Sequence, residues 1–211
     1  PEDMPRLVSR LMETVWQTGC EEAFSMGGRV SLELPMGWLR EEWEKLTNRI
    51  MLDMVSFGLA RQGRVLDRRF WGWGPLDIQS GYRAFSRRAA ERTVQCLEAL
   101  PDDRPVLTFA CELVPFAEIL LAGGICGQIH RQTLVEQPVT SYGDTDLAGT
   151  YGAVIAFMAR HYRIDDGVLE AIVESRVCSS SLLFCDHREQ LFRFLELTHV
   201  DPAKLAMAGF V

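Results

Sequence analysis

The sequence has no excess of basic charge, no visible pattern of a basic segment followed by an apolar run at residues 1–5 that would predict a signal peptide, and no apolar run of membrane length. Its 22 lysines and arginines face 29 acidic residues, for a net charge of −7 at pH 7. Because so acidic a chain is a poor ligand for polyanions, we expect no nucleic-acid partner, and any phosphate chemistry has to use local arginines. The longest apolar stretch, 106–129, is broken by Glu112, Pro115 and Glu118, which favours a buried passage over a membrane span.

None of the six cysteines belongs to a CxxC pair. Scattered thiols and the missing basic leader predict a reducing, cytoplasmic compartment. Cys178, Cys185 and His187 form a C-x₆-C-x-H spacing that matches no usual zinc site. We therefore assign no metal ligand within this chain.

The balance of residues, 47% apolar with a mean hydropathy of zero, excludes disorder and predicts one large globular domain or two small ones. Periodicity and capping signals predict helices over 4–16, 38–59, 87–100, 114–122, 151–162, 166–177 and 187–199. Strands are expected over 20–25, 30–34, 106–110 and 125–139, with a short strand ending at 85 and a loop over 63–75. The chain thus divides into an α/β part, 1–150, and a helical part, 151–211.

Chemistry-bearing side chains cluster at a predicted loop-to-strand junction that contains Asp77, Gln79, Ser80, Gly81 and Arg83. Loops at strand ends are where α/β proteins place ligand groups. Arg83 offers a planar cation for phosphate or carboxylate, and Asp77 can act as a base or orient a hydroxyl. An Asx-turn closed by Asp77, with Arg83 paired to a surface acid, is the structural alternative.

The segment 77–89, DIQSGYRAFSRRA, resembles the D-x-x-SG-[FY]-RAF-x-R-x-A signature of family 2 glycosyltransferases, especially the branch of dolichyl-phosphate mannose synthase and related polyprenyl-phosphate sugar transferases. PEDMPRL at 1–7 is similar to the helix that follows the family's metal-binding D-x-D loop. Residues 46–49 and 129–142 resemble the helix before the signature and the closing strand. The resemblance covers 1–150 and implies a GT-A-like α/β fold, a Rossmann-like mixed sheet with flanking helices, to which 151–211 adds a helical extension.

The resemblance also implies an activity: inverting transfer of a sugar from a nucleotide-sugar donor to an acceptor such as a polyprenyl phosphate or another phosphorylated or carboxylated molecule. It implies Asp77 as the catalytic carboxylate, Arg29 and Arg83 as phosphate contacts, and Mg²⁺ or Mn²⁺ as cofactor. The family's D-x-D ligands precede the PED helix and are not among these residues. Asp144 and Asp146 form another D-x-D at the wrong position for the family, and we assign them no metal.

The loop before the signature places cations beside aromatic rings, which suits a lipid phosphate or a sugar. We expect Arg68 and Arg69 to bind phosphate. The acceptor is expected to meet Trp71, Trp73, Gln79 and Ser80. A solvated basic loop with a buried tryptophan pair is the structural alternative.

A second function class stays open beside the enzyme: a non-catalytic binding or scaffold domain that keeps the glycosyltransferase shell. The extension is expected to be a soluble helical appendage, because charges such as Arg160 and Asp165 interrupt its apolar runs. Its apolar faces make it a candidate surface for a homodimer. A lipid-linked acceptor would bring this cytoplasmic protein to the inner membrane surface.

Overall fold

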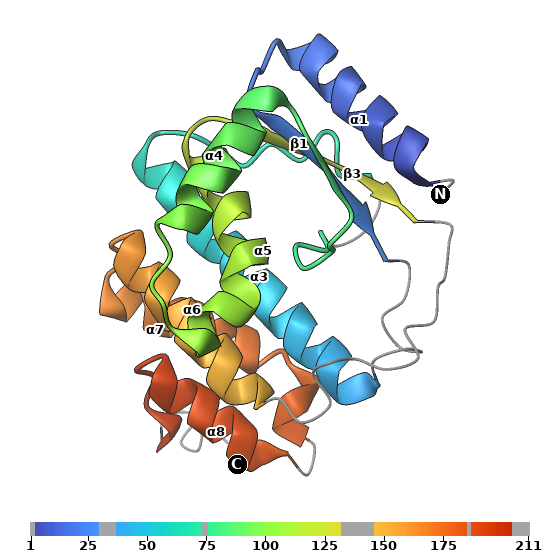
Figure 1. Ribbon diagram of the computed structural model, residues 1–211. Coiled ribbons are helices and arrows are strands. Elements are labelled where there is room, and N and C mark those ends of the chain that lie inside the picture. Colours follow the sequence, from blue (N-terminus) through green and yellow to red (C-terminus); the bar gives the residue numbers. More distant parts are fainter. Residues whose placement is uncertain (1–2, 30–36, 73–75, 132–145, 185–186, 204–211) are drawn as a thin grey trace. The chain divides into compact units, whose positions relative to one another are not determined.

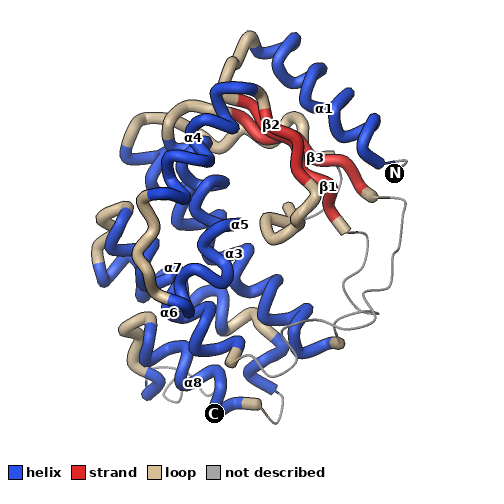
Figure 2. The backbone as a smooth tube through the Cα atoms, in the orientation of Figure 1, coloured by secondary structure: helices blue, strands red, loops and turns tan. Residues whose placement is uncertain are grey.

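The computed structural model describes residues 3–29, 37–72, 76–131, 146–184 and 187–203 (Figure 1). The chain forms two compact units. Unit 1 takes residues 1–31, 59–100 and 110–136, and unit 2 takes 32–58, 101–109 and 137–211. Within the described residues the fold is mixed α/β, and Figure 2 shows the strands together in one small sheet.

The sheet of unit 1 has β1 (Ala23–Gly28) at its centre. It pairs antiparallel with β2 (Arg83–Phe85) and parallel with β3 (Ile125–His130). The strand expected over 20–25 is present but begins at Ala23 and extends to Gly28, and the strand expected over 125–139 is present over 125–130. The expected strand 30–34 and residues 132–139 lie outside the described residues. Because β1 and β3 are parallel, their carboxyl ends lie at the same edge of the sheet, which we call the carboxyl edge.

Helix α1 (Asp3–Thr18) covers one face of this sheet, as the amphipathic pattern predicts. Its Leu7 and Leu11 are buried, and the hydroxyl of Ser25 donates to the Leu7 carbonyl at 2.8 Å. The helix approaches β3 so closely that a Cβ on Gly127 would lie 3.0 Å from the Arg10 side chain. A glycine in β3 therefore allows α1 to pack on the sheet.

Helix α5 (Arg104–Leu121) contributes its second half to the other face. Phe24 is adjacent to Ser25 in β1 and so points away from α1, where its ring packs edge-on against Phe116 at 5.9 Å. The strand expected over 106–110 is wrong, because these residues belong to α5. The segment 106–110 reads VLTFA, and a mostly apolar run of five residues carries no period that separates helix from strand.

Helix α4 (Arg87–Glu98) begins where the sequence predicts, with Ser86 as its N-cap. The Ser86 hydroxyl accepts from the Ala89 N–H and also donates to the Glu21 carbonyl at 2.6 Å. The Ser86 N–H donates to the Ala23 carbonyl at 2.8 Å. One serine thus caps α4 and attaches it to the start of β1.

Unit 2 is helical in its described residues. It holds most of α3 (Trp38–Arg61) together with α6 (Leu147–His161), α7 (Asp166–Val177), η1 (Ser181–Phe184) and α8 (Arg188–Leu197). The helices expected over 38–59, 151–162, 166–177 and 187–199 are therefore confirmed. The helices after residue 146 belong to the same unit as 32–58 and 101–109, two segments that the sequence analysis placed in the α/β part.

Aromatic rings form the centre of unit 2. Tyr151 stacks on Phe109 at 4.3 Å, and Trp43 packs against Phe194 at 5.4 Å. An ion pair from Arg176 of α7 to Asp53 of α3, with a second N–O contact of 2.8 Å, joins two helices of this unit. Within the described ranges, no helix is both long enough and apolar enough to cross a membrane.

Candidate functional site

The candidate site lies at the carboxyl edge of unit 1, where Asp77 pairs with Arg29. Arg29 directly follows β1, and its Nε and Nη2 donate to the two Asp77 carboxylate oxygens at 2.7 Å each. Its backbone N–H adds a third hydrogen bond to Oδ2 at 3.0 Å. With 9% of the Asp77 side chain and 20% of the Arg29 side chain exposed, this is a largely buried bidentate pair. Two residues that the sequence analysis selected separately are therefore in direct contact.

The backbone of Asp77 is held by Gln128, a residue that the sequence analysis missed. Gln128 lies in β3 and is buried, and its Oε1 accepts from the Asp77 N–H at 3.0 Å. Its Nε2 donates to the Trp71 carbonyl at 3.4 Å, and its backbone N–H donates to the Phe70 carbonyl at 2.8 Å. One buried amide thus joins two loops to β3. The signal in the sequence that could have identified Gln128 is an amide within a mainly apolar predicted strand, because a buried amide needs hydrogen-bond partners.

Ser80 and Gln79 are buried in the turn that follows Asp77. The Ser80 N–H donates to the Asp77 carbonyl at 3.1 Å, and its hydroxyl donates to the Gly27 carbonyl at 2.6 Å. The turn is therefore tied to the end of β1. A role for Gln79 and Ser80 in acceptor binding stays a prediction, and the Ser80 hydroxyl hydrogen is already used within the fold.

Arg83 directs its guanidinium at backbone carbonyls. Its Nε donates to Ser80 at 3.0 Å, its Nη1 to Glu112 at 2.9 Å and its Nη2 to Ile78. Burial lowers the pKa of Arg83, because the charged form loses contact with water. The structural alternative, in which Arg83 pairs with a surface acid, is not what the structure shows: this arginine ties the turn to α5. Its role in phosphate binding stays a prediction.

The basic and aromatic loop contains two buried rings, Phe70 and Trp71, and two exposed cations, Arg68 and Arg69, among its described residues. Trp71 is 5% exposed, with the Arg68 guanidinium carbon 5.3 Å from its ring centre. Arg69 pairs with Asp67 at 2.6 Å, and this hydrogen bond lowers the pKa of Asp67. Trp73 lies outside the described residues. Phosphate binding by Arg68 and Arg69 and acceptor binding by Trp71 stay predictions.

No group of three metal-ligating side chains occurs in the part of the chain that the structure describes. Asp146, one half of the D-x-D triplet, caps α6 by accepting from the Gly149 N–H at 3.0 Å and pairs with Arg193 at 2.7 Å. Asp144 and Cys185 lie outside the described residues.

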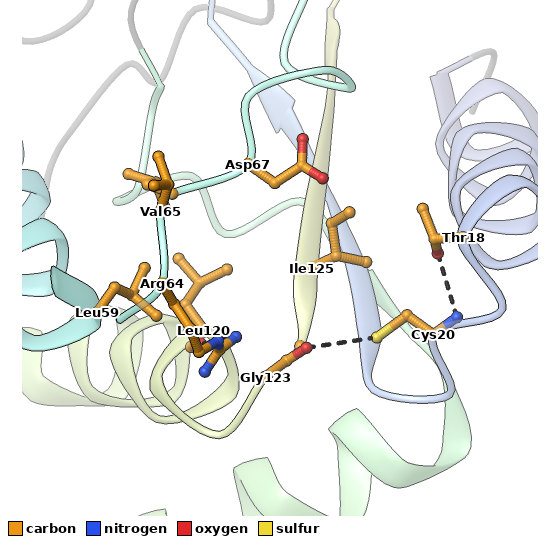
Figure 3. A pocket seen from close by; sticks show the side chains of 11 residues that line it. Thr18, Cys20, Leu59, Arg64, Val65, Asp67, Leu120, Gly123 and Ile125 are labelled. Atoms are coloured by element: carbon orange, nitrogen blue, oxygen red, sulfur yellow. Dashed lines mark hydrogen bonds between the residues drawn. The ribbon is translucent and has the colours of Figure 1, made fainter. Parts of the chain in front are cut away.

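A cavity of about 260 Å³ opens near the other end of β3 (Figure 3). Arg64 lines it and donates to the Leu121 carbonyl at 3.1 Å, while the Cys20 thiol contacts the Gly123 carbonyl at 3.7 Å. Asp67, the acidic residue in its lining, is paired with Arg69. None of the described residues that the sequence analysis assigned to the site lines this cavity, and Asp77 and Arg29 pair at the carboxyl edge instead.

In comparisons with protein-family models, curated proteins and solved structures, the chain matches none. A functional assignment therefore has to come from the groups at the carboxyl edge. These are a buried carboxylate in a hydrogen-bonded turn and several guanidinium groups, the combination that binds phosphate esters and polarises or orients hydroxyl groups.

Proposed function

We propose that the chain is the acceptor-side part of a GT-A-like glycosyltransferase, which transfers a sugar with inversion from a nucleotide-sugar donor to a phosphorylated or carboxylated acceptor. One observation supports this most strongly. Asp77, in the segment that resembles the family signature, lies at the carboxyl edge of two parallel strands and is oriented by Arg29. This edge is the usual ligand position in open α/β sheets.

The geometry supports a simple division of roles. For an acceptor hydroxyl, the oxygen attacks the anomeric carbon, the bond to the donor diphosphate breaks, and the proton passes to the Asp77 carboxylate. For an acceptor phosphate no proton is transferred, and Asp77 orients the nucleophile through its contacts. Arg29 fixes the carboxylate and adds positive charge where the diphosphate leaves.

The divalent cation that the resemblance implies does not fit the described carboxylates. Both oxygens of Asp77 accept hydrogen bonds from Arg29, and Asp3 pairs with Arg6 at 2.9 Å. Mg²⁺ or Mn²⁺ binds carboxylate oxygens, and the oxygens of these two groups already accept hydrogen bonds from arginines. The proposed steps therefore use the chain's own side chains.

The same ion pair favours a second candidate function, a non-catalytic module with a glycosyltransferase-like shell. A carboxylate that accepts three hydrogen bonds from one arginine is also what a purely structural ion pair would show. In the enzyme, Asp77 is needed for turnover. In the non-catalytic module, it contributes to stability alone.

The test is a transfer assay with the natural protein that contains this chain. Nucleotide sugars of different bases are combined with phosphorylated, carboxylated and neutral acceptors, and nucleoside diphosphate release and product mass are measured. We expect transfer to a charged acceptor and a loss of at least about 100-fold in Asp77→Asn.

Asp53→Asn is the matched control, because it breaks a similar bidentate aspartate–arginine pair in unit 2. It should keep wild-type turnover. No transfer by the wild-type protein would favour the non-catalytic module, whereas equal turnover in Asp77→Asn would keep the enzyme and remove Asp77 from its chemistry.

A further inference from the structure

Arg131 differs from the other arginines at the carboxyl edge in what it contacts. Arg29 pairs with Asp77, Arg6 pairs with Asp3, and Arg83 donates to backbone carbonyls. Arg131 directly follows β3, and no carboxylate among the described residues pairs with it. Within the described ranges, its guanidinium therefore has no ion-pair partner, whereas the neighbouring arginines at this edge are already engaged.

The position of Arg131 is fixed by its backbone and by Tyr82. The Arg131 N–H donates to the Gly28 carbonyl at 2.9 Å, which places this residue beside the end of β1. Its guanidinium carbon lies 4.1 Å from the centre of the Tyr82 ring. A Cβ on Gly27 would lie 3.1 Å from Arg131 Cγ and 3.2 Å from Tyr82 Cβ, so the glycine leaves room for both side chains.

This stacked arrangement leaves hydrogen-bond donors of Arg131 unused. A guanidinium that stacks on a ring uses its face, while its N–H groups point outward in its plane. The Nε of Arg131 is buried and has no hydrogen-bond partner among the residues that the structure describes. An acceptor with several oxygens, such as a phosphoryl group, matches both the charge and the planar fork of donors.

We propose that Arg131, supported by Tyr82, forms a phosphoryl-binding site at the carboxyl edge. The inference deepens the proposed function and rests on it for the identity of the ligand: the phosphoryl group is that of a phosphorylated acceptor or of the donor diphosphate. Tyr82 is a positioning residue that holds the guanidinium flat, and Arg131 makes the contact with the ligand.

Calorimetric titration of the chain tests this site without any sugar transfer. Phenyl phosphate represents an acceptor phosphate monoester, and uridine diphosphate represents the donor side. We expect at least one probe to bind and its Kd to rise at least tenfold in Arg131→Ala. Arg131-dependent binding of phenyl phosphate alone assigns the acceptor, and that of uridine diphosphate alone assigns the donor.

Matched variants separate recognition from folding. Tyr82→Phe keeps the ring and should bind like wild type, whereas Tyr82→Leu removes the platform and should bind several-fold more weakly. Arg87→Ala removes an exposed arginine of α4 and should change nothing. If Arg131→Ala does not fold, Arg131→Gln removes the charge at similar length and is expected to lose binding as well.

The inference is overturned if wild type binds neither probe, or if the charge-removing variants at position 131 fold and bind as wild type does. This result is distinguishable from failure of the proposed function. If the protein binds phosphate but transfers no sugar, the glycosyltransferase function is rejected and the phosphoryl-binding site is retained. If it transfers sugar but its phosphate binding does not depend on Arg131, only the phosphoryl-binding site is rejected.

Discussion

Gly28 and Gln128 face each other so closely that a Cβ on Gly28 would lie 2.9 Å from both Cδ and Oε1 of the Gln128 amide. The amide is buried and cannot swing aside, because it accepts from the Asp77 N–H and donates to the Trp71 carbonyl. The absence of a side chain at Gly28 is therefore a condition for the turn that carries Asp77.

Gly28→Ala should lower the free energy of unfolding by about 2 kcal/mol, the usual size of an overpacking defect. Gly81→Ala is the control in the same turn, since a Cβ there meets no atom within 4 Å, and it should change stability little. Urea unfolding measures both. Equal stability of the two variants would show that Gln128 can move at little cost.

The Arg29 and Asp77 side chains should be energetically coupled. Arg29→Met leaves a mostly buried carboxylate without its cation and should cost about 2 kcal/mol of unfolding free energy, somewhat less than a fully buried pair because one-fifth of Arg29 is exposed. In a double-mutant cycle with Asp77→Asn, we expect a coupling energy of about 2 kcal/mol. Additive losses would mean that the two groups contribute independently.

Arg83→Lys should destabilise unit 1 even though it keeps the positive charge. An ammonium cannot reach the carbonyls of Ile78, Ser80 and Glu112 in the fork geometry of a guanidinium. Carbonyls that lose their donors should cost about 2 kcal/mol in total. Arg87→Lys on the exposed face of α4 should stay within about 0.5 kcal/mol of wild type, and denaturant unfolding compares the two.

Arg69→Ala should raise the pKa of Asp67 toward its ordinary value, because the Arg69 hydrogen bond is the main cause of the lowered pKa. A lowered carboxyl pKa in the folded state stabilises above the unfolded-state pKa, and this contribution disappears as the pH falls through the folded value. Wild type should therefore lose this stabilisation below about pH 4. A carboxyl ¹³C NMR titration of both proteins checks the shift, and an unchanged Asp67 pKa in the variant would contradict it.

Cys96 should react slowly with alkylating reagents at neutral pH. Burial raises the pKa of its thiol to about 11, which leaves about one thiolate in a thousand at pH 8. Its alkylation rate by iodoacetamide should therefore increase about tenfold per pH unit between pH 8 and 10. Mass spectrometry after timed quenching measures the rate, and the urea-unfolded chain is the reference. A rate at pH 8 equal to that reference would contradict the raised pKa.

Local signals predicted most of the helices. The apolar positions of α1 repeat at helical spacing, and Ser86 has the residue type that caps a helix. The strand expected over 106–110 failed because this segment, VLTFA, is short and mostly apolar, and such a run occurs in helices and strands alike. Tertiary burial, which a short window cannot show, decided that segment.

The candidate site was predictable in its residue types and not in its contacts. Asp77 and Arg29 are separated by dozens of residues, and their pairing depends on β1 ending beside the turn. Gln128 and Arg131 were missed because a single amide within a strand, or an arginine directly after one, is common. The importance of each depends on which residues the fold places beside it. Arg83 shows the opposite outcome. Its residue type is typical of a ligand-binding site, but its guanidinium donates to backbone carbonyls of the fold.

The parallel pairing of β1 with β3 also determines when the carboxyl edge can exist during folding. Ala23 lies opposite Ile125, so roughly one hundred residues have to be made and brought back before this pair closes. Helices α1 and α4 can form early from local contacts, but the surface that α1 covers is complete only after β3 has docked. During synthesis on the ribosome, the edge of β1 that later pairs with β3 therefore stays unpaired while the intervening helices emerge. Closure of this long loop, rather than helix formation, is expected to set the folding rate of unit 1.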